Sequence, residues 1–301
     1  MIELGIETWI NFWKSNVCET DWYYRLRQRP DLQIVFVLLV VVLSVSIFAP
    51  IISPHDPAVQ DLYGKNQWMS ADHWFGTDYL GRDLFSRVVC GLQTSMTIAV
   101  TTIATTFVIG TMIGSYAGYK GGWVDNVISR VIDVFLAFPS IILALALVTF
   151  LDSGILNMIL MLVIAQWASF ARLMRGQVLV EKNAEYILSA CAAGLPGWWI
   201  LIKHLIPNCI MSVVVLATLE LGHVILTIST LSFLGLGLSP SIPEWGSMIN
   251  AGLDSMRTAP LNVVVPGLSI TTVALLFNLA GEGIRDIIDP GTDAEGSLWT
   301  F

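Results

Sequence analysis

The chain contains 301 residues, of which 55% are hydrophobic and only 13% are charged. A soluble domain carries roughly 25% charged residues, and the mean hydropathy here is +0.71. The formal net charge is −8, whereas binding to nucleic acid needs clustered Lys and Arg. The four cysteines show no C-x-x-C spacing that would indicate a zinc site or a disulfide framework. These values exclude a disordered chain, a nucleic-acid-binding protein and most soluble enzymes, and they favour an integral membrane protein.

The N-terminal part predicts a surface segment followed by an anchor. Within residues 1–31, Ile6, Trp9, Ile10 and Trp13 recur at helical spacing, which indicates a short helix at the membrane surface, with a floppy tail as the alternative. Residues 32–52 form an uncharged apolar run. This run starts too late and is too long for a cleaved signal peptide, so we expect it to remain as the first membrane span.

Five further apolar segments bring the expected number of spans to six, because about 20 helical residues cross the hydrocarbon layer. They cover residues 95–119, 127–151, 155–170, 208–234 and 262–280. Segment 127–151, the third span, contains Pro139, which lacks an amide hydrogen, so we expect a kink there. In segment 95–119, the second span, Gly110, Gly114 and Gly118 are four residues apart and predict a smooth face for close helix packing.

The distribution of Lys and Arg predicts that both termini are cytoplasmic. In that orientation 11 of the 15 basic residues lie inside, and only Lys65, Arg82, Arg87 and Arg257 lie outside. Residues 53–94 and 239–261 then form external loops, which are either solvated loops with interfacial tryptophans or a rim on which a partner docks. These loops contain Asp56, Asp61, Asp72, Asp78, Asp83, Glu244 and Asp254, together with Trp68, Trp74 and Trp245.

Ionisable residues at membrane depth are candidates for function, because bare charge there is unfavourable. Asp133 lies one helical turn from Arg130, which predicts either an internal ion pair near the cytoplasmic edge or a functional group. Glu220 and His223 are also three residues apart. They form either a transition-metal pair or a buried hydrogen-bonded pair.

The cytoplasmic connection 171–207 contains a short helix over residues 185–194 with small side chains, ended by Gly194. A turn at Pro196-Gly197 precedes a second short helix over residues 198–205, which we expect Pro207 to end. A small-faced helix that projects from the membrane can enter a groove on a partner protein; the alternative is a plain linker.

Four blocks, in order, resemble the membrane subunit of binding-protein-dependent ABC importers of the peptide/nickel branch, second-permease type. They are HWFGTDYLGRDLFSR at 73–87, AGY at 117–119 with Arg130, Asp133 and Phe138-Pro139-Ser140, LSFLGLG at 231–237 with PEWG at 243–246, and FNL at 277–279 with GEGIRD at 281–286 and Asp289-Pro290. The resemblance implies an all-α membrane protein with six transmembrane helices, the type I importer permease (MetI-like) fold, a core over residues 95–290, a cytoplasmic tail at 291–301 and a cytoplasmic coupling helix.

A fifth block resembles the EAA segment of this family, which is the coupling loop. Gly194, His204 and Pro207 match the pattern, but Leu188 stands where the glutamate is expected and Cys191 where arginine is common. The ion pair drawn from that glutamate is therefore not available, and docking must depend on shape and apolar contact. The resemblance implies an ATPase-coupling surface made of Glu185, Ser189, Ala190, Ala192, Gly194, His204 and Pro207.

The chain lacks G-x-x-x-x-G-K-[ST], so it has no phosphate-binding loop of its own. The resemblance implies a non-catalytic subunit of the bacterial inner membrane that binds no cofactor. Its implied partners are a sister permease, two ATP-binding subunits that hold ATP and magnesium, an extracytoplasmic solute-binding protein and the lipid bilayer. Candidate residues for its half of the translocation path are Asp133, Pro139, Glu220 and His223.

The resemblance leaves three substrate classes open. Short peptides are the commoner substrate in this branch, but ATLELGH at 217–223 and QWA at 166–168 are similar to nickel permeases. Nickel or a metal chelate is the first alternative, and a glutathione-like solute is another. Two other protein classes fit poorly, because an intramembrane enzyme would show a motif such as H-E-x-x-H or G-x-S-x-G and a stand-alone secondary transporter would show an internal repeat.

Overall fold

The computed structural model describes residues 29–150 and 154–288. The expected surface helix around Ile6–Trp13 and the expected tail at 291–301 lie outside these residues. The described part is helical, and its only bridge between extended residues pairs Thr77 with Asp83. In chain order the elements are α3 (Pro30–Ile47), α4 (Ala49–Ile52), α5 (Leu84–Lys120), α6 (Gly122–Leu136), α7 (Ser140–Val148), α8 (Ile155–Glu181), α9 (Glu185–Ala192), α10 (Gly197–Ile200), the π-helical turn η1 (Leu201–Leu205), α11 (Ile206–Phe233), α12 (Trp245–Gly252), the 3₁₀ turn η2 (Leu253–Ser255) and α13 (Leu261–Ile288).

Five helical stretches are long and apolar enough to cross a membrane, and a bent pair, α6 with α7, makes up to six. The five are α3, α5, α8, the stretch from α10 through α11, and α13. The all-helical class and the expected set of spans are therefore confirmed.

The kink expected at Pro139 is a break in the third span. Helix α6 ends at Leu136, Pro139 stands immediately before α7, and the two helix axes differ by 82°. Proline cannot donate the hydrogen bond that would continue the helix, and its ring disfavours helical geometry in the residue before it.

Two predicted boundaries on the cytoplasmic connection are wrong. Helix α8 continues to Glu181 instead of ending at Phe170, so Arg172 and Arg175 lie on a helix and not in a loop. The second short helix does not end at Pro207, because a π-helical turn at Leu201–Leu205 joins it to α11. Pro207 follows this turn within one continuous helical stretch, Gly197–Phe233, and cannot donate a helical hydrogen bond to the preceding turn. A π-helical turn is a local departure from α-helical hydrogen bonding, and it stands directly before this proline.

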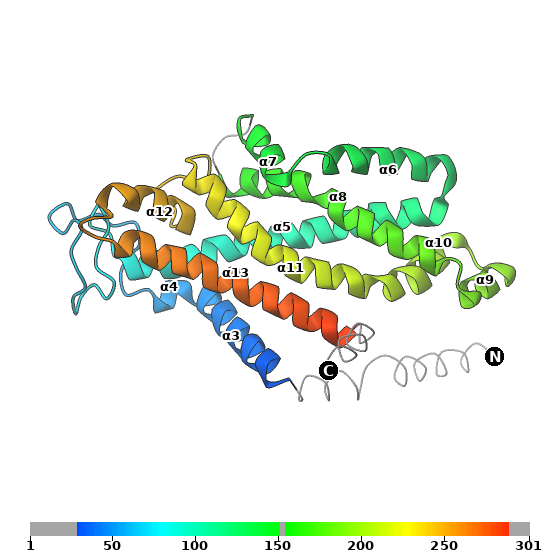
Figure 1. The fold of residues 1–301 in the computed structure, drawn as a ribbon, viewed down its shortest axis with the longest axis horizontal. Helices are drawn as coiled ribbons and strands as arrows, with labels where there is room; N and C mark the ends of the chain where they lie inside the picture. The colour runs from blue at the N-terminus through cyan, green and yellow to red at the C-terminus, as the bar shows by residue number, and fades with distance from the viewer. Residues whose placement is uncertain (1–28, 151–153, 289–301) are drawn as a thin grey trace, which may run out of the picture.

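The helices pack as a long bundle with different structures at its two ends (Figure 1). Helices α9 and α10 lie at one end, which we call the α9 end; residues 53–83, α4 and α12 lie at the other, which we call the loop end. Between them α5 packs closely on α8, because a Cβ added at Gly110, Gly114 or Gly118 would overlap α8. Glycine at these positions lets the two backbones approach.

Candidate functional site

At the α9 end, one buried side chain fastens a largely exposed helix. Ile187 is only 1% exposed and packs in the same core as Ile200 of α10. The small residues Ser189 and Ala192 are exposed, Ala190 is half-buried, and Leu188, where the family's glutamate is expected, is 56% exposed. The predicted coupling helix therefore presents a small and apolar surface to its surroundings.

The turn after α9 leaves open space around Gly194. Its φ is +79°, a conformation that L residues rarely adopt, and a Cβ built there would meet no heavy atom within 4 Å. Glu185 is also exposed, and it starts the helix instead of pairing across it. A partner could approach Gly194 closely without displacing any described part of the chain.

Tyr186, which the sequence analysis did not single out, ties α9 to two spans. Its hydroxyl bonds to Glu181 at the end of α8 and accepts a hydrogen bond from Asn208 Nδ2 of α11 at 2.6 Å. Burial, followed by the bond to Glu181, raises the pKa of Tyr186 to about 12. The predicted coupling residue His204 lies beside it, with ring centroids 6.5 Å apart. One side chain of α9 therefore contacts both α8 and α11.

The predicted path residues lie on separate helix pairs. Asp133, on α6, pairs with Arg172 Nη2 of α8 at 2.7 Å and not with Arg130, because α8 stays helical past its predicted end. Glu220 and His223 lie on α11, which packs on α13, α5, α8 and α12, whereas α6 packs on α8 and α5. Glu220 is half-buried and His223 exposed, so this pair is not enclosed within the chain.

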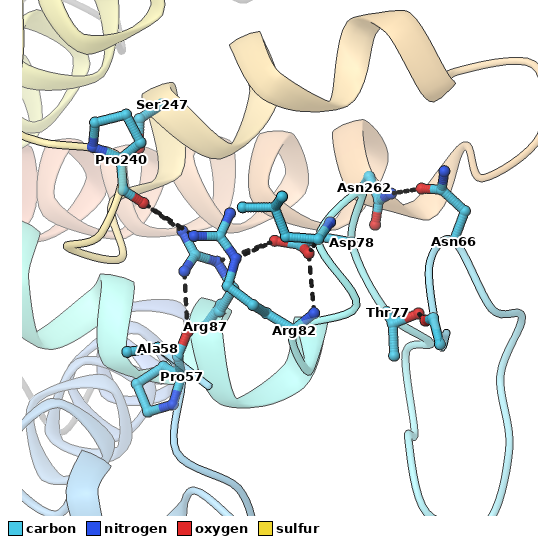
Figure 2. A network of polar contacts seen from close by, with 12 residues as sticks. Pro57, Ala58, Asn66, Thr77, Asp78, Arg82, Arg87, Pro240, Ser247 and Asn262 are labelled. Atoms are coloured by element: carbon cyan, nitrogen blue, oxygen red, sulfur yellow. Dashed lines mark hydrogen bonds and ion pairs between the residues drawn. The ribbon is translucent and has the colours of Figure 1, made fainter. Parts of the chain in front are cut away.

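The loop end is fastened by a buried cluster of charge (Figure 2). Asp78 Oδ2 lies 2.6 Å from Arg82 Nε and 3.6 Å from Arg87 Nε. Arg87 is 2% exposed, and its guanidinium donates to the carbonyl oxygens of Pro57 at 3.0 Å and Pro240 at 3.4 Å. Arg82 also donates to Pro240, at 3.1 Å. The cluster joins the segment after α4, the segment before α5 and the segment before α12.

Two further acidic residues of this end cap helices. Asp83 accepts from the amide of Ser86 at 2.8 Å and begins α5, and Glu244 accepts from the amides of Gly246 and Ser247 at 2.9 Å and begins α12. Such caps satisfy amide groups that have no partner within the helix. Burial raises the pKa of Glu244, and these hydrogen bonds oppose the rise.

The sequence predicted that the external loops are either solvated loops or a docking rim for a partner. Neither alternative describes all of their residues. Asp78, Asp83, Glu244 and Trp245 are buried, so they are neither solvated loop residues nor a docking rim. Trp68 and Trp74 are exposed. The motif at 73–87 gave the signal: two arginines and two aspartates within ten residues can neutralise one another, which allows them to be buried.

Comparison with known proteins decides the family. Residues 110–294 match the model of the binding-protein-dependent transport system inner membrane component. The chain belongs to this family. The glutathione transport system permease protein GsiD of Escherichia coli is 42% identical over 283 residues, covering 94% of this chain and 90% of that protein. The dipeptide transport system permease protein DppC of Alkalihalophilus pseudofirmus is 38% identical, covering 90% of each chain.

Solved structures agree on the fold of this permease. A chain of the MetNI methionine ABC transporter, in an inward-facing conformation, superposes with a TM-score of 0.56 at 18% identity. The match covers 67% of this permease and 96% of that chain. The MetI-like fold and the resemblance to the second permease of the peptide/nickel branch are thereby confirmed.

Proposed function

We propose that the permease forms half of an ATP-driven importer for short peptides, with α9 as the surface that receives the ATP-binding subunits. The observation that carries this proposal is the α9 end: an exposed, small-faced helix held by Ile187 and linked by Tyr186 to α8 and α11. Its proposed partners are a sister permease, two ATPase chains that hold ATP and magnesium, and an external solute-binding protein.

The distribution of basic residues supports an orientation with the α9 end in the cytoplasm. Lys120, Arg172 and Arg175 lie on helices that run toward that end; Lys182 directly follows α8, and Lys203 lies in η1. Two of the four bases assigned outside, Arg82 and Arg87, share the carboxylate of Asp78 within the loop end. Basic residues favour the cytoplasmic side, so the loop end would face the solute-binding protein and both termini would lie inside.

In the proposed mechanism, closure of the ATPases pushes on the exposed face of α9. The hydroxyl of Tyr186 transmits the movement to α8 and α11, and the close α5–α8 contact makes these helices move together. The break at Pro139 lets α7 change its direction independently of α6. Access to the path would then change from the loop end to the α9 end.

The names of the relatives support a peptide substrate. GsiD is a glutathione permease and DppC a dipeptide permease, and glutathione is itself a short peptide. We therefore place peptides first, with a glutathione-like solute within that class.

Nickel or a metal chelate is the second candidate, and Glu220 with His223 is the observation that favours it. The two residues are one helical turn apart on α11, with His223 exposed toward the surroundings of the chain. A Glu-x-x-His pair on one helix supplies carboxylate and imidazole ligands for a transition metal.

Uptake into proteoliposomes that contain the complete transporter tests the proposal. Labelled dipeptide, glutathione and ⁶³Ni²⁺ are supplied with the cognate binding protein, with and without ATP inside the vesicles. The proposal predicts ATP-dependent uptake of a peptide and no uptake when the ATPase chains are left out. Uptake without those chains would overturn it, and uptake of ⁶³Ni²⁺ that Glu220→Gln abolishes would favour the second candidate.

A further inference from the structure

Three side chains that the proposed mechanism does not use converge at the loop end. His73 Nδ1 lies 2.9 Å from Asp83 Oδ1, and His55 Nδ1 lies 3.9 Å from Asp83 Oδ2. One potential ligand atom from each of the three residues lies within 4.8 Å of the others. The two imidazole rings are 4.9 Å apart and tilted by 38°. The chain has only four histidines in all, so finding two of them beside one carboxylate is a specific arrangement.

The three residues are held in place by contacts other than those to one another. Asp83 Oδ2 accepts from the amide of Ser86 at 2.8 Å and from its hydroxyl at 2.6 Å. The amide of His55 donates to the same hydroxyl at 3.2 Å, and the amide of His73 donates to Ser70 Oγ at 3.0 Å. These bonds fix the backbone of both histidines and the carboxylate of Asp83, and ligating carboxylates in metal sites are hydrogen-bonded in the same way.

We propose that His55, His73 and Asp83 bind a divalent transition-metal ion of the Zn²⁺ or Ni²⁺ type. Zn–N and Zn–O bonds are about 2.0–2.2 Å, which puts tetrahedral ligand atoms about 3.4 Å apart. The nitrogens of His73 and His55 lie 2.9 and 3.9 Å from the two different oxygens of Asp83, and one ligand atom of each residue lies within 4.8 Å of the others. An ion would therefore replace the direct His73–Asp83 contact and draw the two rings toward one carboxylate. Two imidazoles and one carboxylate form a borderline ligand set that suits these ions better than Ca²⁺ or Mg²⁺.

The exposure of the three residues indicates how the ion would be reached. The side chain of Asp83 is 2% exposed, and that of His55 is 43% exposed. An ion would therefore have its carboxylate ligand on the protein side and remain accessible from the His55 side. Three protein ligands leave one tetrahedral position for water or for a donor group of another molecule.

A bound ion would join the segment after α4 to the start of α5. Arg87 already links these segments through the carbonyl oxygen of Pro57. The metal would therefore stabilise the surface of the loop end, and it would do so whichever solute the permease transports.

Metal binding to the purified full-length permease in its complete transporter tests this site. The protein carries an affinity tag without histidine, is stripped with a chelator, and is then titrated with Zn²⁺ and, separately, with Co²⁺ as a spectroscopic probe. We expect wild type to bind one more equivalent of Zn²⁺ than His55→Ala, or to bind that equivalent at least about 10-fold more tightly. Replacing even a residue that only hydrogen-bonds to a metal ligand weakens metal binding by about 10- to 100-fold. The Co²⁺ complex of wild type should show visible absorption bands that His55→Ala lacks.

His55→Ala is the most specific variant, because it removes only the imidazole ring. The His73–Asp83 contact and the hydrogen bond from the backbone amide of residue 55 to Ser86 Oγ stay in place. His223→Ala is the matched control, since it removes a histidine from the other predicted metal pair. Equal melting temperatures of wild type and His55→Ala in EDTA, with Zn²⁺ raising only that of wild type, would support the site. Equal Zn²⁺ binding by wild type and His55→Ala would overturn the proposed site, and the contact between His73 and Asp83 would then be a hydrogen bond without a metal role. Loss of the ion in His223→Ala but not in His55→Ala would also overturn it.

Discussion

The two ends of this permease differ in how their side chains are buried. At the loop end, Asp78, Arg82 and Arg87 are buried and paired, and their bonds to Pro57 and Pro240 join distant segments. At the α9 end, Ile187 is buried while Leu188 and Trp198 are 56% and 62% exposed. A buried charge cluster cannot lose one member without strong destabilisation, whereas an exposed helix with few buried contacts opens more easily and is available to a partner. The comparison indicates that one end is built to hold its shape and the other to be completed by another protein.

The largest expected effect comes from breaking the buried cluster of the loop end. Asp78→Ala would leave two arginines buried without their carboxylate, which should destabilise the fold by about 3–5 kcal/mol. We expect a lower melting temperature and less folded permease in the membrane. Asp254→Ala, at an exposed position of the same end, should change stability by less than about 0.5 kcal/mol. Equal melting temperatures for the two variants would contradict the structural role of the cluster.

A smaller effect is expected between the ends, where α5 meets α8. In Gly114→Ala the new Cβ would overlap the carbonyl oxygen of Ala171, and overpacking of this kind costs about 1–3 kcal/mol. The matched control is Gly176→Ala, where a Cβ meets nothing within 4 Å; replacing an interior helical glycine there should be neutral or stabilising by up to about 1 kcal/mol. Thermal unfolding in detergent compares the melting temperatures of the two variants. A lower melting temperature for Gly176→Ala than for Gly114→Ala would contradict the close contact between α5 and α8.

The smallest expected change in stability belongs to the α9 end. Tyr186→Phe removes the hydroxyl shared by Glu181 and Asn208, which should cost about 0.5–1.5 kcal/mol. The functional effect should be clearer: less substrate imported per ATP hydrolysed, because α9 loses its polar link to α8 and α11. Tyr63→Phe, at a fully exposed tyrosine of the loop end, should leave that ratio unchanged. If Tyr186→Phe imports as much substrate per ATP hydrolysed as wild type, this hydroxyl does not take part in coupling.

Periodicity and hydropathy were enough to predict the spans and the break at Pro139, because both depend on local chemistry. They misplaced the end of α8, since Arg172 and Arg175 look like loop residues until their partners are known. Those partners, Asp133 and Asp125, come from α6. Likewise, the burial of Arg87 depends on carbonyl oxygens that are 30 and 153 residues away in the chain. No local pattern reports such contacts.

The candidate site was predictable to a similar degree. The small residues of α9 and Gly194 were evident from the sequence, and the structure adds that the space around Gly194 is open. Tyr186 was missed because a lone tyrosine in a short helix carries no signal without Glu181 and Asn208 beside it. The cluster of His55, His73 and Asp83 was missed because its members are separated by 18 and 10 residues of irregular chain.

The amount of substrate imported per ATP hydrolysed in Gly194→Trp tests most directly whether the α9 end receives the ATPases. Gly194→Asn is the control, because asparagine tolerates a positive φ without adding comparable bulk, and Ser189→Trp adds the same bulk at an exposed helical position. With all variants folded and inserted, we predict that both tryptophan variants lose ATP-driven import in proteoliposomes while Gly194→Asn retains most of it. Import at the wild-type ratio in both tryptophan variants would contradict the account.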